Sequence, residues 1–112
     1  MKAMILGTGA VGSVTAEILG RSEEFDKVVL ADVNIERARR AEKRISSEKV
    51  TVQKVDASNM DSLVTAIKGI DIVLNAVIPR FNINIMKACI NAKASYSDMA
   101  WDVALDKTKP GG

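Results

Sequence analysis

The chain has 112 residues, of which 47% are hydrophobic and 27% charged, as in a single soluble globular domain too small for a complete two-site enzyme. The net charge of +2 is too small to indicate a nucleic-acid partner. The lack of histidine argues against a zinc or other metal site, and a single cysteine cannot form an internal disulfide. No apolar run is long enough to span a membrane and no signal peptide is recognisable, so we expect a cytoplasmic protein without a membrane partner.

Strands and helices are predicted in regular alternation. Short apolar runs predict five strands, at residues 3–6, 27–31, 50–55, 71–77 and 94–98. Helical periodicity predicts five helices, at residues 10–20, 35–45, 60–67, 82–92 and 101–107. In the first helix the periodic apolar residues are Val11, Val14, Ile18 and Leu19. In the fourth we expect Ile83, Met86 and Ile90 to be buried.

This alternation predicts an α/β fold with a doubly wound parallel sheet and helices on both faces. Right-handed crossovers between parallel strands give the expected strand order 3-2-1-4-5. Because the chain stops after the fifth strand, we expect residues 1–112 to be the N-terminal domain of a longer, two-domain protein.

A glycine-rich loop follows the first predicted strand and opens the first predicted helix. It consists of Gly7, Thr8, Gly9, Ala10, Val11 and Gly12, and G-x-G-x-x-G in this context is typical of dinucleotide-binding Rossmann domains. Gly7 would allow a tight turn, Gly9 would let the backbone approach a pyrophosphate, and Gly12 would let the helix pack closely on the sheet. The helix N-terminus from Ala10 would hold the diphosphate.

Asp32 ends the second predicted strand, 20 residues after Gly12, and is the expected acceptor for the adenosine ribose hydroxyls. Its negative charge would repel a 2′-phosphate, which favours NAD over NADP, although Arg37 or Arg39 would soften that repulsion. Further cofactor contacts are expected where the second, third and fourth strands end, at Val33, Asp56, Ala57, Asn75, Ala76 and Val77.

Three later segments carry a family resemblance. Residues 71–79 (DIVLNAVIP), 84–90 (NIMKACI) and 94–100 (ASYSDMA) resemble the saccharopine dehydrogenase-like family, which includes saccharopine reductases, lysine 6-dehydrogenases and carboxynorspermidine synthases. The resemblance implies an oxidoreductase that transfers hydride between NAD(P) and an amine or imine carbon. It also implies that a C-terminal domain holds the amino-acid substrate, and we expect the full-length protein to be a homo-oligomer. The present chain would then hold the cofactor without completing the chemistry, and its sequence identifies no catalytic residue.

Two other functions remain open from the residues alone. A regulatory domain that senses NAD or another nucleotide, as in potassium transport, would use the same loop and acid and would need no catalytic histidine. The loop at Pro79 and the strand end at Tyr96 argue against it. An atypical short-chain reductase is disfavoured, because Ala100 stands where a Tyr-x-x-x-Lys motif beginning at Tyr96 would need lysine.

Overall fold

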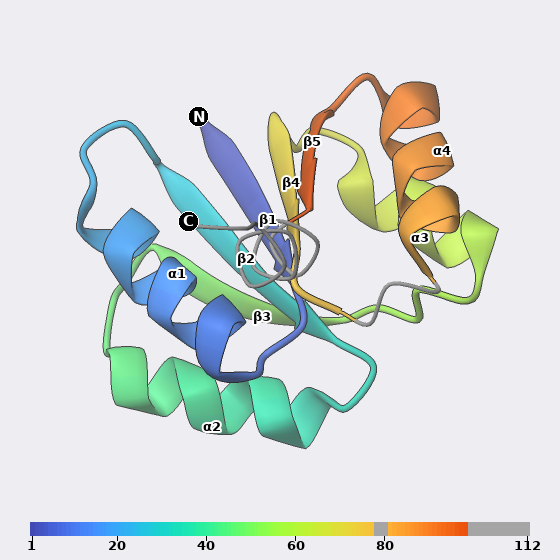
Figure 1. Cartoon of the computed structure of the whole chain (residues 1–112). Helices are drawn as coiled ribbons and strands as arrows, with labels where there is room; N and C mark the ends of the chain where they lie inside the picture. Colours follow the sequence, from blue (N-terminus) through green and yellow to red (C-terminus); the bar gives the residue numbers. More distant parts are fainter. Residues whose placement is uncertain (78–80, 99–112) are drawn as a thin grey trace, which may run out of the picture.

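A five-stranded parallel sheet forms the centre of the computed structural model (Figure 1), which describes residues 1–77 and 81–98. The strands are β1 (Lys2–Leu6), β2 (Lys27–Asp32), β3 (Val50–Lys54), β4 (Ile72–Asn75) and β5 (Ser95–Asp98). Their order is β3-β2-β1-β4-β5, and all four pairings are parallel, as predicted. The predicted helix at 101–107 and the loop at Pro79 lie outside the described residues.

Helices cover both faces of the sheet (Figure 1): α1 (Ala10–Arg21) and α2 (Ile35–Ile45) on one side, α3 (Met60–Ile67) and α4 (Asn82–Ala92) on the other. Side chains of β1 alternate between the two layers, with Ala3 and Ile5 in the α1–α2 core and Met4 and Leu6 in the α3–α4 core. This strand reads as an unbroken apolar run because it is buried on both faces. In the part of the chain that the structure describes, no helix is long and apolar enough to cross a membrane.

Two asparagines fix where helices begin. The side chain of Asn34 accepts a hydrogen bond from the Arg37 N–H (3.2 Å), and that of Asn59 accepts one from the Ser62 N–H (3.0 Å). Both are N-caps of the usual kind, satisfying a donor that has no partner within its own helix. The first of them starts α2 directly after the end of β2, which brings the N-terminus of α2 beside Asp32.

The strand β4 ends two residues earlier than predicted. The Ala76 N–H still donates to the Leu6 carbonyl (2.7 Å), but the Val77 N–H turns back to the side-chain Oδ1 of Asn75 (3.0 Å). A local side-chain acceptor thus replaces the sheet partner and turns the chain away. The strand β3 likewise ends at Lys54, one residue before the predicted end.

The predicted buried face of α4 is wrong. Ile83, Met86 and Ile90 are 66%, 49% and 77% exposed, whereas the buried residues of the helix are Ile85, Ala88 and Cys89. The helix carries two apolar stripes, and the stripe with the smaller side chains is the one that packs into the α3–α4 core. Periodicity alone did not distinguish the two stripes.

The helix α1 shows the same preference for small residues at its contact with the sheet. Gly12 and Ala16 are its buried residues, and Val11, Val14 and Ile18 are exposed. The periodic residues therefore marked the helix correctly, but three of the four lie on its outer side, and only Leu19 packs against the core. Close approach of α1 to β1 leaves room only for the smallest side chains.

Candidate nucleotide-binding site

The glycine loop joins β1 to α1 at the edge where the parallel strands end. Gly7 has φ +103°, a conformation that glycine adopts readily, and its N–H donates to the Ala31 carbonyl (2.8 Å). A Cβ at Gly7 would lie 2.8 Å from the Ala76 carbonyl oxygen. Position 7 therefore requires glycine both for its φ angle and for its contact with the turn after β4.

The other two glycines of the loop have different surroundings. A Cβ on Gly12 would lie 2.0 Å from the carbonyl oxygen of Gly7 and 3.4 Å from Ile5 Cγ2, so the closest constraint comes from the loop itself rather than from the sheet. A Cβ on Gly9, the N-cap of α1, would meet no protein atom within 4 Å. Open space therefore lies beside the helix N-terminus, where first-turn N–H groups can receive an anion.

Asp32 is held by the glycine loop. Its Oδ2 accepts hydrogen bonds from the Thr8 N–H (3.2 Å) and the Thr8 hydroxyl (2.5 Å), and its Oδ1 accepts one from the Asn34 N–H (2.9 Å). Thr8 and Asp32 are only 4% and 7% exposed. Asp32, the predicted ribose acceptor, thus links the glycine loop to the end of β2, and its carboxylate has a fixed orientation.

One cation of α2 lies beside this carboxylate, and others follow along the helix. Arg37 Nε lies 3.9 Å from Asp32 Oδ2, and Arg37, Arg40, Lys43 and Arg44 together line a shallow groove on α2. The neighbouring Arg39 points elsewhere and pairs with Glu36 at 3.3 Å. The sequence named Arg37 and Arg39 as residues that could soften the negative charge of Asp32, and in the structure only Arg37 of these two lies near it.

A small pocket opens beside Asp32 and collects residues from the ends of several strands. Its volume is about 240 Å³, and its walls are Leu6, Ala31, Asp32, Val33, Val55, Asp56, Ala57, Val77 and Phe81. Five of the predicted cofactor contacts meet here: Asp32, Val33, Asp56, Ala57 and Val77. The lining is largely apolar with carboxylates at two places, which suits a planar base attached to a polar sugar.

Asp56 closes one side of this pocket and stays ionised. Hydrogen bonds from the Ser58 hydroxyl (2.6 Å) and then from the Ser58 N–H (2.9 Å) lower the pKa of the Asp56 carboxyl below its ordinary value. These bonds also hold the turn between β3 and α3 in place. The carboxylate is solvent-exposed and therefore accessible at the mouth of the pocket.

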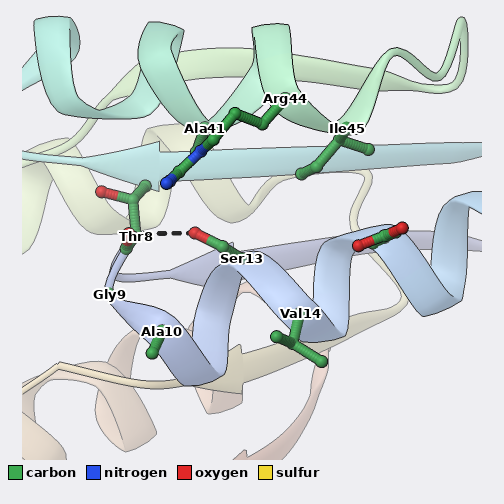
Figure 2. A pocket seen from close by; sticks show the side chains of 9 residues that line it. Thr8, Gly9, Ala10, Ser13, Val14, Ala41, Arg44 and Ile45 are labelled. Carbon is green, nitrogen blue, oxygen red and sulfur yellow. Dashed lines mark hydrogen bonds between the residues drawn. The ribbon is translucent and has the colours of Figure 1, made fainter.

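A groove of about 420 Å³, larger than the pocket beside Asp32, runs between α1 and α2 (Figure 2). Gly9 and Ala10 line one end of it, beside Thr8, whose carbonyl accepts a hydrogen bond from the Ser13 hydroxyl (3.0 Å). Arg44 extends from α2 toward Thr8 (Figure 2). Thr8 lines this groove while its partner Asp32 lines the smaller pocket, so their hydrogen bond connects the walls of the two cavities.

The remaining predicted contacts lie apart from these cavities. Val11 lies on the exposed side of α1. Asn75 is completely buried, and its amide is engaged by neighbouring protein groups. The Ala76 carbonyl packs against Gly7. The structure therefore places Asn75 behind the surface of the site, whereas Ala76 is partly exposed beside Gly7.

Sequence reasoning gave no role to Thr8 or Phe81, although both form part of the site. The hydroxyl of Thr8 inside the loop was a usable signal, because an acid at the end of the next strand is a natural partner for it. Phe81 had no comparable signal, since nothing in its local sequence indicates that it lines a pocket with the ends of β1, β2 and β3.

The described residues place neither a reactive thiol nor a metal-binding cluster at this site. Burial raises the pKa of the Cys89 thiol to about 11, which keeps it protonated and unreactive near neutral pH. Among residues 1–77 and 81–98, no group of three or more acidic, histidine or cysteine side chains is placed to hold a metal ion.

Comparison with known proteins identifies relatives over most of the chain. Residues 3–109 match the family model described as the saccharopine dehydrogenase NADP binding domain. Carboxyaminopropylagmatine dehydrogenase of Synechocystis sp. is 32% identical over 101 residues, covering 88% of this chain and 25% of that protein. Carboxynorspermidine synthase of Vibrio alginolyticus is 34% identical over 126 residues, covering 99% of this chain and 29% of that protein.

Solved structures agree on the fold. Saccharopine dehydrogenase (L-Glu forming) of Saccharomyces cerevisiae superposes with a TM-score of 0.78 at 20% identity, covering 87% of this chain and 21% of the other. The present chain thus spans about a quarter of the length of these relatives. The resemblance predicted from the sequence is confirmed. The family description names NADP, whereas the negative charge of Asp32 predicts a preference for NAD.

Proposed function

Since the chain belongs to the saccharopine dehydrogenase NADP binding domain family, we propose that it is the cofactor-binding domain of an NAD(P)-dependent dehydrogenase. The observation that carries this proposal is the placement of the buried Asp32 carboxylate between the open N-terminus of α1 and the 240 Å³ pocket. The diphosphate would lie at Gly9 and Ala10, the ribose at Asp32, and the adenine in the pocket against the Phe81 ring. The nicotinamide would supply or accept the hydride.

For the choice of cofactor, we propose that the domain binds both NAD(H) and NADP(H), with Asp32 and Arg37 as opposing determinants. Asp32 accepts from a free ribose 2′-hydroxyl and repels a 2′-phosphate. Arg37, with Nε 3.9 Å from that carboxylate and its side chain 57% exposed, offsets the repulsion and can donate to a phosphate. The family description supports binding of NADP(H), and the Asp32 carboxylate supports binding of NAD(H).

We further propose that the full-length protein acts at an amine or imine carbon of an amino-acid substrate. The names of the relatives support this, because they are a saccharopine dehydrogenase, a carboxyaminopropylagmatine dehydrogenase and a carboxynorspermidine synthase. The chain itself offers no histidine for acid–base chemistry. Because the chain spans about a quarter of the length of these relatives, we propose that substrate binding and catalysis involve residues outside these 112.

Calorimetric titration of the chain with NADH, NADPH and ADP tests the cofactor proposal. We expect dissociation constants for NADH and NADPH within about tenfold of each other, because one charged hydrogen bond offsets one repulsion. Failure of both dinucleotides to bind would refute the proposal. Equal binding of ADP and both dinucleotides, with no contribution from nicotinamide, would favour the nucleotide-sensing alternative.

Substitutions separate the two determinants. Arg37→Gln should weaken NADPH binding about tenfold and leave NADH within about twofold, since only the phosphate loses a charged donor. Arg39→Gln is the matched control, because Arg39 is on the same helix, is 58% exposed and pairs with Glu36. Asp32→Ala should weaken NADH more than NADPH. An equal loss of both cofactors would contradict the ribose contact.

A further inference from the structure

One completely buried amide joins the end of β4 to three neighbouring segments. The Nδ2 of Asn75 donates to Asn82 Oδ1 at the start of α4 (2.7 Å) and to Tyr96 Oη on β5 (3.0 Å). Its Oδ1 accepts the hydrogen bond from the Val77 N–H (3.0 Å). A carboxamide has two N–H donors and one carbonyl acceptor, so each of its groups has a protein partner.

The turn held by this amide forms part of the nucleotide site. The Ala76 carbonyl packs against Gly7, and Val77 Cγ1 lies 3.2 Å from the position of a Cβ at Gly7. Val77 and Phe81 are walls of the 240 Å³ pocket that also contains Asp32. The described residues that line this pocket do not include Asn75, Asn82 or Tyr96. These three residues can therefore affect a ligand in the pocket only by positioning Val77.

We propose that Asn75, Asn82 and Tyr96 form a positioning unit that sets the Val77 wall of the nucleotide pocket. Tyr96 thereby controls nucleotide affinity without contacting the nucleotide. This inference rests on the proposed function, because it assigns a role within the same site.

The reason lies in the cost of leaving a buried amide partly unsatisfied. If Tyr96 loses its hydroxyl, one Nδ2 hydrogen of Asn75 loses its acceptor in a completely buried place. The amide then rotates or shifts to find another partner, and its Oδ1 no longer accepts from Val77 in the same geometry. The wall of the pocket moves although no group that touches the ligand has been changed.

The test measures the affinity of the 112-residue chain for ADP by calorimetry, because the pocket is assigned to the adenosine part. Tyr96→Phe should raise the dissociation constant about fivefold or more, within the usual range for a lost buried hydrogen bond. Ser95→Ala is the matched control, since Ser95 is an exposed residue of the same strand. It should leave affinity within about twofold.

A spectroscopic measurement separates positioning from general stabilisation. In Tyr96→Phe the amide ¹H–¹⁵N signal of Val77 should shift and its hydrogen exchange should accelerate, because its acceptor has moved. In the double variant with Asn75→Ala, the loss of affinity should be no greater than in Asn75→Ala alone, since both substitutions disrupt one network.

Unchanged ADP affinity in Tyr96→Phe would overturn the inference, and so would a loss of affinity with an unmoved Val77 signal. If Tyr96→Phe does not fold, Asn82→Asp and Asn82→Leu give an independent test: aspartate keeps the acceptor oxygen and should retain affinity, whereas leucine should lose it. Equal affinities in these two variants would overturn the inference. Failure of the unsubstituted chain to bind ADP or a dinucleotide would instead refute the proposed function itself.

Discussion

Replacing Thr8 by valine tests the link between the glycine loop and β2. Valine keeps the shape and the backbone N–H of residue 8 but removes the hydroxyl that donates to Asp32 Oδ2 at 2.5 Å. A hydrogen bond to a charged group contributes about 1.5–3 kcal/mol. We expect a loss of stability near the lower end of this range if the Thr8 and Asn34 N–H groups alone satisfy the carboxylate. If the carboxylate stays partly unsatisfied, we expect a loss near the upper end, because Asp32 is only 7% exposed and water cannot replace the lost donor.

Urea denaturation and thermal melting of the chain without ligand measure this loss. For a protein of this length, 1 kcal/mol corresponds to about 4 °C in melting temperature, so Thr8→Val should melt about 6–12 °C lower. Thr8→Ser is the control, because it keeps the hydroxyl and removes one methyl group worth about 0.8 kcal/mol. A valine variant as stable as the original chain, or a serine variant as unstable as the valine variant, would refute this reasoning.

Three other substitutions or treatments have clear expected outcomes. Gly12→Ala should displace the glycine loop, because a Cβ there would lie 2.0 Å from the Gly7 carbonyl oxygen, and should weaken dinucleotide binding at least about tenfold in a calorimetric titration. Gly9→Ala should leave the fold intact, because a Cβ there would meet no protein atom within 4 Å. Leu63→Ala should lower the free energy of unfolding in urea by about 2–5 kcal/mol, since Leu63 is a fully buried residue of α3; a loss below about 1 kcal/mol would contradict its place in the core. Iodoacetamide at pH 8 should modify Cys89 at least about a hundredfold more slowly in the native chain than in urea. The reason is that burial raises the pKa of the thiol from the ordinary value of 9.0 to about 11, which lowers the fraction present as thiolate. Similar rates in the two conditions would show that the thiol is not buried.

The fold could be predicted because its signals are local and repeated. The apolar run in β1 and the glycine loop after it identify a strand, a turn and a helix within twelve residues. Five such units in alternation leave few topologies, since parallel strands need right-handed crossovers. The Asn34 and Asn59 caps show that even the starts of helices are set by neighbouring residues.

The remaining features depend on contacts between segments far apart in the sequence. Which stripe of α4 is buried depends on how closely that helix packs on α3 and the sheet, and the two stripes have similar periodicity. The sequence predicts that Asp32 ends β2 beside the glycine loop, but its hydrogen bonds to Thr8 depend on side-chain directions. Asn75 was predicted to contact the cofactor because it ends a strand. Its burial by Tyr96 and Asn82 could be seen only once β5 and α4 had been placed.

The walls of the pocket beside Asp32 come from segments between Leu6 and Phe81, so the pocket forms only when the strands β1 to β4 are assembled. An unfolded or partly folded chain has no such cavity and should bind a dinucleotide poorly. Folding and ligand binding are then linked, and a ligand present at a hundred times its dissociation constant would add about 2.7 kcal/mol to the stability of the folded chain. The amount of intact domain in a cell would therefore rise and fall with the supply of its ligand.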